Sequence, residues 1–176
     1  MRDSARKFRL HLSEKANDIG TLYHSLLEKI NFFDMHNVQD IQDYIECNYQ
    51  KQEIDIFKQL SYENIFKNIN ILKNKISPQD KVLKEQKFVM CVPYNQISNS
   101  TNTSKVLIQG VMDLIIIKDN KIILIDYKLT HKSKQQIIDT YHKQLELYSL
   151  ALSKRFKNMQ IERLILNLYQ GEIINI

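Results

Sequence analysis

The pattern of hydrophobic and polar positions divides the chain into a helical first part and a second part rich in strands. Hydrophobic residues recur at the 3.6-residue spacing of amphipathic helices in three segments of the first part. These positions are Leu22, Leu26, Leu27 and Ile30, then Val38, Ile41 and Ile45, and then Ile54, Phe57, Leu60, Ile65, Ile69 and Leu72. Asn37 and Ser61 are predicted N-caps. Pro78 disfavours a helical residue before it, so we expect the helices to end near Ser77.

Strand character begins at Val82 and is interrupted by one further helix. Phe88, Met90 and Val92 alternate along a strand, and residues 106–117 and 121–128 are rich in Val, Ile and Leu. Residues 133–156 return to helical spacing, and residues 161–169 predict a last strand. The polar run 95–104 predicts an exposed loop. The predicted order is therefore helices, three strands, a helix and a strand, which is an α/β fold.

Length and composition narrow the class of protein. A chain of 176 residues that is 43% hydrophobic suits a single domain over 1–176, with a helical part at 1–77 and a sheet core at 82–176. Its net charge of +5 suits a polyanionic partner but is weak evidence. Neither of the two cysteines lies in a CxxC pair, and the three glycines cannot form an ATP-binding GxxxxGK loop. The lack of a signal peptide or long apolar run predicts a cytoplasmic protein without membrane contact.

Two aspartates and a lysine interrupt the two most apolar predicted strands. If Asp119 and Asn120 form a tight hairpin loop, paired positions sum to 239, and Asp113 lies opposite Asp126. Lys128 then follows on the same face of the sheet, because side chains alternate along a strand. A four-residue loop keeps this pairing, whereas a three-residue loop would put the two aspartates on opposite faces.

Facing carboxylates repel one another unless a proton or a cation lies between them. A divalent metal ion resolves the conflict, and oxygen ligands suit Mg²⁺ or Mn²⁺. The Tyr127 backbone carbonyl could reach such an ion. The alternative is that the two acids and the lysine form a solvated hairpin, since the pattern DxK also arises by chance.

Asp113 followed by Asp126-x-Lys128 resembles the PD-(D/E)xK nuclease core, and four surrounding motifs narrow the resemblance. They are Gly20-Thr-Leu-Tyr-His24, Gly110-Val-Met-Asp113, Ile125-Asp126-Tyr127-Lys128 and Gln144-Leu-Glu-Leu-Tyr148. Their order and spacing resemble the RecB-like nuclease domain that ends the helicase/nuclease AddA of bacterial double-strand-break repair. The resemblance implies a restriction-endonuclease-like core, in which helices flank a central mixed sheet. It extends from Gly20 to about Tyr169.

The resemblance implies a role for each of these positions. His24, Asp113, Asp126 and the Tyr127 carbonyl would bind Mg²⁺, with Mn²⁺ as an alternative, and Lys128 would assist the attacking water. Gln144 and Tyr148 lie four residues apart and would orient the lysine or the scissile strand. Glu85, in the motif Glu85-Gln86-Lys87-Phe88, could assist the site, although a structural role is the simpler expectation. The missing cysteines exclude the relatives with iron–sulfur clusters, and Leu129 follows the lysine where the family more often has threonine.

DNA is the expected substrate, and the phosphate contacts are predicted at Lys132, Lys134 and Lys143 or in the N-terminal stretch with Arg2, Arg6, Lys7 and Arg9. A helicase in cis or in trans, with a second helicase/nuclease subunit, would deliver single strands. Two other functions stay open. One is a non-catalytic module that binds DNA or docks a partner subunit, and the other is a restriction or transposition endonuclease, which need not carry the GxxxH and QxxxY motifs.

Overall fold

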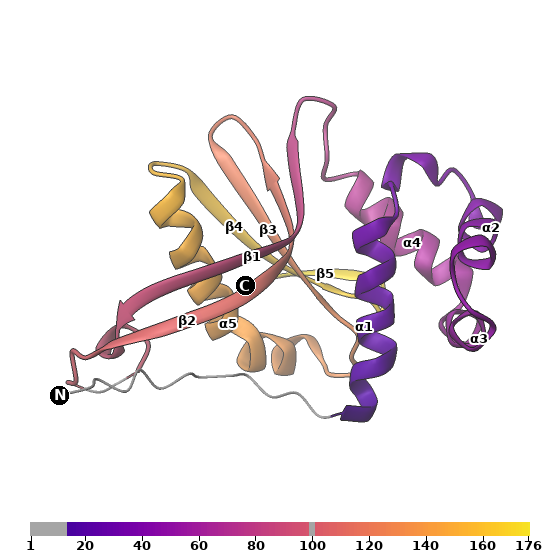
Figure 1. Cartoon of the computed structure of the whole chain (residues 1–176). Helices are drawn as coiled ribbons and strands as arrows, with labels where there is room; N and C mark the ends of the chain where they lie inside the picture. Colours follow the sequence, from indigo (N-terminus) through magenta and orange to yellow (C-terminus); the bar gives the residue numbers. More distant parts are fainter. Residues whose placement is uncertain (1–13, 99–100) are drawn as a thin grey trace.

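A computed structural model describes the backbone of residues 14–98 and 101–176, with side chains from Ile19 onward. The first part of the chain folds into four helices and one short 3-10 turn, as Figure 1 shows in indigo and purple. They are α1 (Glu14–Lys29), η1 (Phe32–Asp34), α2 (Val38–Asn48), α3 (Lys51–Leu60) and α4 (Tyr62–Lys73). Asn37 begins α2 with a reciprocal capping box to Asp40, as predicted.

The second part forms a five-stranded mixed sheet in the order β1-β2-β3-β4-β5. The strands are β1 (Lys81–Pro93), β2 (Lys105–Ile117), β3 (Lys121–Lys128), β4 (Gln160–Asn167) and β5 (Glu172–Asn175). Only β3 and β4 pair in parallel, and the helix α5 (Lys134–Arg155) makes the crossover between them. The α/β class and the mixed sheet flanked by helices are therefore confirmed. No helix in the described part of the chain is long and apolar enough to span a bilayer.

The hairpin of β2 and β3 has the predicted register as far as Leu114 and Ile125, where the ladder ends, so the predicted direct pair of Asp113 with Asp126 is not formed. Lys118 N–H donates to the Lys121 carbonyl at 2.8 Å around Asp119 and Asn120, and Leu114 pairs with Ile125. The remaining pairs, through Ile117 with Ile122, also sum to 239. The register thus directs Asp113 and Asp126 toward the same place at the open end of this hairpin.

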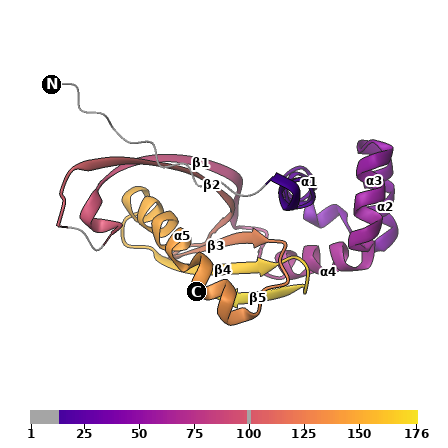
Figure 2. The same ribbon diagram turned by 90° about the horizontal axis from the view of Figure 1, so that it is seen from below.

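The sheet separates two hydrophobic cores. Residues of the first four helices form one core with residues on one face of the sheet, such as Leu114, Ile125 and Leu166, and α2 and α3 pack on the other helices. Helix α5 packs on the other face, where Leu145 and Leu152 contact Leu124 and Ile165. Figure 2 shows that β1 and β2 extend beyond the other strands as a long two-stranded arm that curves over α5. The arm and α1 lie on either side of the point where β2 and β3 separate.

Two details differ from the sequence-based expectation. Ser61 stands at the N-cap position of α4, but its φ is +65° and its hydroxyl donates to the Glu63 carboxylate instead of accepting from the helix. The last predicted strand ends at Asn167, because the chain turns through Gly171 (φ +60°) and returns as β5. The sequence after Gly171 is too short for periodicity to reveal that strand.

Candidate metal centre

The two aspartates lie where β2 and β3 part, and both are buried, with 7% of Asp113 and 1% of Asp126 exposed. The ladder of residue pairs ends at Leu114 and Ile125. Beyond it, the Tyr127 backbone N–H donates to Asp113 Oδ2 at 2.6 Å. The Asp113 carboxylate thus accepts the hydrogen bond that a backbone carbonyl of β2 would accept in a regular ladder. This bond to a buried N–H fixes the orientation of the carboxylate.

His24 reaches this place from α1. Its Nδ1 lies 3.5 Å from Asp113 Oδ1, and its ring meets the Tyr127 ring edge-on, with centroids 5.5 Å apart. Burial lowers the pKa of His24, but the hydrogen bond and charge of Asp113 outweigh burial and leave the pKa raised. The imidazole is therefore oriented by a carboxylate, an arrangement common for histidines that bind metals.

Helix α1 is attached to the rest of the molecule on both sides of His24. The Tyr23 hydroxyl accepts from the buried Asn68 of α4 at 2.8 Å. The Lys84 ammonium of β1 donates to the Leu27 and Ile30 carbonyls, at 2.8 and 2.6 Å, and so binds the C-terminal end of the helix. These contacts place the imidazole beside the open end of the β2–β3 hairpin.

Glu85 completes the cluster from β1. Its neighbours Lys84 and Gln86 pair with Leu114 and Met112, so that Glu85 faces Asp113 by register, yet its φ of +47° takes it out of the regular strand. Such a conformation is costly for a residue with a Cβ, and residues of this kind concentrate at functional sites. One ligand atom from each of His24, Glu85 and Asp113 lies within 4.8 Å of the others.

This position favours the expectation that Glu85 assists the site over a structural role. Burial raises the pKa of Glu85 to about 7, and the charge of Asp113 acts in the same direction. Ionisation of Glu85 beside another carboxylate is therefore unfavourable, and a bound cation would stabilise the ionised form. The sequence contained the signal in the Glu85 motif, but only the β1–β2 register places this residue opposite Asp113.

Asp126 and Lys128 form a buried ion pair next to this cluster. Lys128 Nζ lies 2.6 Å from Asp126 Oδ2, which agrees with the expectation that both side chains are on one face of β3. Burial raises the pKa of Asp126 despite the opposing charge of Lys128. Burial acts to lower the pKa of Lys128, but the charges of Asp126 and Asp113 outweigh it and raise that pKa. The lysine is therefore held as a cation.

Gln144 and Tyr148 approach the same carboxylate from α5. The Gln144 amide donates to Asp126 Oδ1 at 3.1 Å and to the Tyr148 hydroxyl at 2.8 Å. Gly110 of β2 leaves room for Tyr148, because a Cβ at this position would lie 3.2 Å from the Tyr148 ring and 2.8 Å from the Phe88 ring. Gln144 thus contacts Asp126. The sequence had suggested instead that Gln144 orients Lys128 or the scissile DNA strand.

The structure brings most of the expected residues together in two adjoining groups. His24, Glu85 and Asp113 form the group with metal-ligand spacing, and Asp126 lies outside it, engaged by Lys128 and Gln144. The Tyr127 ring is buried on the α1 side of the sheet, where it contacts the His24 ring, and the Tyr127 backbone N–H contacts Asp113. An imidazole nitrogen with two carboxylate oxygens is a donor set that fits a divalent cation such as Mg²⁺ or Mn²⁺.

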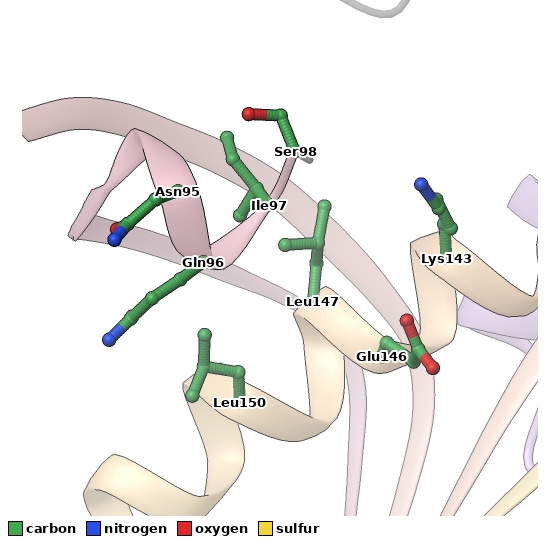
Figure 3. Close-up of a pocket in the computed structure, with 8 residues that line it drawn as sticks. All are labelled: Asn95, Gln96, Ile97, Ser98, Lys143, Glu146, Leu147 and Leu150. Atoms are coloured by element: carbon green, nitrogen blue, oxygen red, sulfur yellow. The ribbon is translucent and has the colours of Figure 1, made fainter. Parts of the chain in front are cut away.

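The lysines expected to bind DNA occupy different places. Lys132 lies with Lys128 against the ring of Tyr141, at 5.3 and 4.9 Å from its centroid. Lys134 is exposed at the start of α5. Lys143 instead lines a pocket between α5 and the end of the β1–β2 arm, together with Asn95 and Leu147 among others (Figure 3). The N-terminal basic stretch lies outside the described residues.

Comparison with known protein families agrees with this geometry. A family model described as the PD-(D/E)XK nuclease superfamily matches residues 3–174. The chain therefore belongs to the PD-(D/E)XK nuclease superfamily, as its motifs suggested. The fold supports the same assignment, because the two aspartates and the lysine lie on the adjacent strands β2 and β3 of the sheet.

Several bacterial proteins of the AddA type, named as subunits of an ATP-dependent helicase/nuclease, are similar to most of the chain. The protein of Oenococcus oeni is 31% identical over 165 residues, which cover 89% of this chain and 14% of that protein. The proteins of Ligilactobacillus salivarius and Ruminiclostridium cellulolyticum are 26% and 28% identical over 164 and 171 residues. These matches cover 89% and 88% of this chain, and 13% of each relative. The chain thus spans about a seventh of the length of these relatives or slightly less.

Proposed function

We propose that this chain is a Mg²⁺-dependent deoxyribonuclease domain that hydrolyses phosphodiester bonds in DNA. The observation that carries the proposal is the juxtaposition of two groups at the open end of one hairpin. His24, Glu85 and Asp113 have metal-ligand spacing, and the ion pair of Asp126 and Lys128 lies beside them. Two buried aspartates next to a partly buried glutamate and a largely buried lysine are costly for folding, which supports a functional reason for this cluster.

His24, Asp113 and Glu85 would hold the ion, and Asp126 with the Tyr127 carbonyl would complete its protein ligands. When bound, a divalent ion supplies Lewis acidity and lowers the pKa of water. Asp113 keeps its geometry through the Tyr127 N–H, and it orients the His24 imidazole through Nδ1. The ligands are thus positioned before the substrate arrives, which reduces the reorganisation needed during the reaction.

Lys128 would bind the scissile phosphate and the attacking water. Its ammonium is buried and held as a cation by Asp126 and Asp113, so it can stabilise negative charge that develops on the phosphate oxygens. Gln144 and Tyr148 would act indirectly. Gln144 donates to the Asp126 carboxylate, the partner of Lys128, and also to the Tyr148 hydroxyl. Burial raises the pKa of Tyr148 to about 12, so its hydroxyl stays neutral.

The wider role is inferred from the relatives. Their names combine helicase and nuclease, and this chain matches only a small part of each. We infer that it acts with a helicase, in cis or in trans, and with a second helicase/nuclease subunit in the repair of double-strand breaks by recombination in the bacterial cytoplasm. Residues 1–176 would form one nuclease domain, and Lys132, Lys134 and Lys143 would contact DNA phosphates.

A cleavage assay tests this function. Labelled single- and double-stranded DNA is incubated with the wild-type chain, Asp126→Ala and Lys128→Ala in Mg²⁺, Mn²⁺ or EDTA. Glu46→Gln serves as the control, because Glu46 is exposed on α2. We expect cleavage by the wild type and the control only with metal, and a loss of at least about 100-fold in both site variants.

Equal cleavage by the wild type and both site variants would refute the assigned site. If no form cleaves DNA and all bind it with the same affinity, the chain is a non-catalytic binding module of the same fold.

A further inference from the structure

An exposed pair of aromatic rings lies just beyond the catalytic lysine. His131, in the segment between β3 and α5, and Tyr169, in the turn after β4, are both exposed, and Tyr169 retains 48% of its accessible surface. Their ring centroids are 3.7 Å apart, with planes inclined by 57°. Two rings that pack on each other while facing solvent offer an aromatic surface that costs little further ordering when a ligand binds.

The position of this ring pair follows from the pairing of β3 and β4. Lys128 pairs with Asn167, and the Leu168 N–H donates to the Lys128 carbonyl at 2.9 Å. Leu168 is thus hydrogen-bonded to Lys128, and Tyr169 is the next residue in the chain. His131 follows Lys128 by three residues. The ring pair therefore lies at the same end of the sheet as the catalytic lysine.

The turn that carries Tyr169 is fixed by its own hydrogen bonds. The Tyr169 N–H donates to the side chain of the buried Asn167 at 3.1 Å, and the Gly171 N–H donates to the Asn167 carbonyl at 2.8 Å. Lys67 of α4 donates to the Gln170 carbonyl at 2.9 Å. The exposed tyrosine thus stands on a braced turn.

A cation next to the ring pair continues the line of positive charge from the active site. Lys128 and Lys132 both lie against the ring of Tyr141, and Lys132 Nζ also donates to Thr140 Oγ1 at 3.2 Å. Lys132 directly follows His131 in the sequence. The segment between β3 and α5 therefore carries an exposed aromatic ring and an ammonium group at consecutive positions, next to the site at which the phosphodiester would be cleaved.

We propose that His131, Tyr169 and Lys132 form a subsite for one nucleotide of single-stranded DNA, adjacent to the scissile phosphate. The base stacks on the exposed rings, and Lys132 contacts the neighbouring phosphate. Stacking on aromatic side chains and phosphate contacts from lysines are the two recurring elements of single-strand binding without sequence preference. A duplex cannot use this subsite without unpairing, because its bases are already stacked on each other. The subsite rests on the proposed nuclease function, and it assigns particular residues to the recognition of an unpaired base.

The test measures binding of a labelled 12-nucleotide strand and of the matching duplex to the full chain in EDTA. We expect Tyr169→Ala to weaken single-strand binding roughly 5- to 100-fold, and to change duplex binding less than about twofold. Tyr169→Phe, which keeps the ring, should bind like the wild type. A strand of abasic sugars should bind the wild type and Tyr169→Ala equally, because it has no base to stack.

Lys132→Ala provides a second, independent measurement. It should reduce the slope of log affinity against log salt by about 0.7, as expected for one lost contact to a single-strand phosphate. Lys58→Ala, an exposed lysine of α3, should leave that slope unchanged.

The subsite is refuted if the wild type does not bind single strands, if Tyr169→Ala binds them as the wild type does, or if removal of the bases leaves wild-type affinity unchanged. Failure of the nuclease function gives a different result. In that case the Tyr169-dependent binding persists, but no DNA is cleaved when Mg²⁺ is added.

Discussion

The substitution Glu85→Gln should make the metal-free chain more stable and the metal-loaded chain less stable than the wild type. The folded chain holds Glu85 with a pKa of about 7 against an ordinary value of 4.5. Between these values the folded state binds more protons than the unfolded state, so stability falls as the pH rises through this window. Above pH 7, in the absence of metal, the ionised carboxyl group therefore lowers the free energy of unfolding by its full amount.

The size of this cost follows from the same numbers. A difference between about 7 and 4.5 corresponds to roughly 3 kcal/mol for a fully buried group. Glu85 is only partly buried, so solvent screening reduces the expected gain from Glu85→Gln to about 1 kcal/mol. For a chain of this length, a gain of that size raises Tm by about 2–4 °C. Glutamine at this position keeps the same backbone conformation, so the strain at φ +47° is common to both proteins.

Bound metal should reverse the order of stability. At a Mg²⁺ concentration of 100 times its Kd, the wild type gains about 2.7 kcal/mol. If the loss of one ligand weakens binding about 100-fold, the variant gains only about 0.4 kcal/mol at that concentration. The assay is thermal and urea denaturation at pH 8, in EDTA and in Mg²⁺, with Glu46→Gln as the control. A variant that is less stable than the wild type in EDTA, or that gains as much from Mg²⁺, would refute the role of Glu85 as a ligand.

Three further predictions concern the same region. Lys128→Met should lower the urea midpoint much more at pH 8 than at pH 5. At pH 8 the variant leaves Asp126 as a buried unpaired charge, at a cost of about 3–5 kcal/mol, and protonation of Asp126 at low pH removes this cost; equal losses at the two pH values would contradict this. Gly110→Ala should cost about 1–3 kcal/mol in unfolding experiments because its Cβ has no room, whereas Gly20→Ala, where a Cβ meets nothing within 4 Å, should stabilise α1 by up to about 1 kcal/mol. Calorimetric Mg²⁺ affinity should rise from pH 6 to pH 8 as Glu85 loses its proton, and Glu85→Gln should flatten this rise; a rise of the same size in the variant would show that another group is titrated.

The hairpin that carries the two aspartates could be predicted from the sequence because its pairing depends on two local features. Asp119 and Asn120 favour a short loop, and alternation along the strands then determines which side chains share a face. The observed pairs, from Leu114 with Ile125 to Ile117 with Ile122, agree with that reasoning. Motif spacing likewise placed Gln144 and Tyr148 on one face of a helix, where they contact each other.

The contacts of the site could not be predicted in the same way, because they depend on long-range geometry. Glu85 faces Asp113 only because of the register in which β1 pairs with β2. The connection from Tyr94 to Ser104 is too long for its length to determine that register. The Asp113 carboxylate accepts from the Tyr127 backbone, an arrangement that appears only where the ladder ends. Helix α1 could approach the sheet in many ways, and contacts such as those of Lys84 with its last carbonyl groups decide its position.

The most direct test of the metal centre is the anomalous diffraction signal of Mn²⁺ in a crystal of the full chain. We expect a peak within bonding distance of the His24 imidazole and of the Glu85 and Asp113 carboxylates, on the side of the Asp126 and Lys128 pair. The same peak should be lost in Asp113→Asn and kept in Glu46→Gln. A Mn²⁺ peak bound elsewhere, or none at this cluster at a concentration that supports cleavage, would contradict the assignment of these residues as metal ligands.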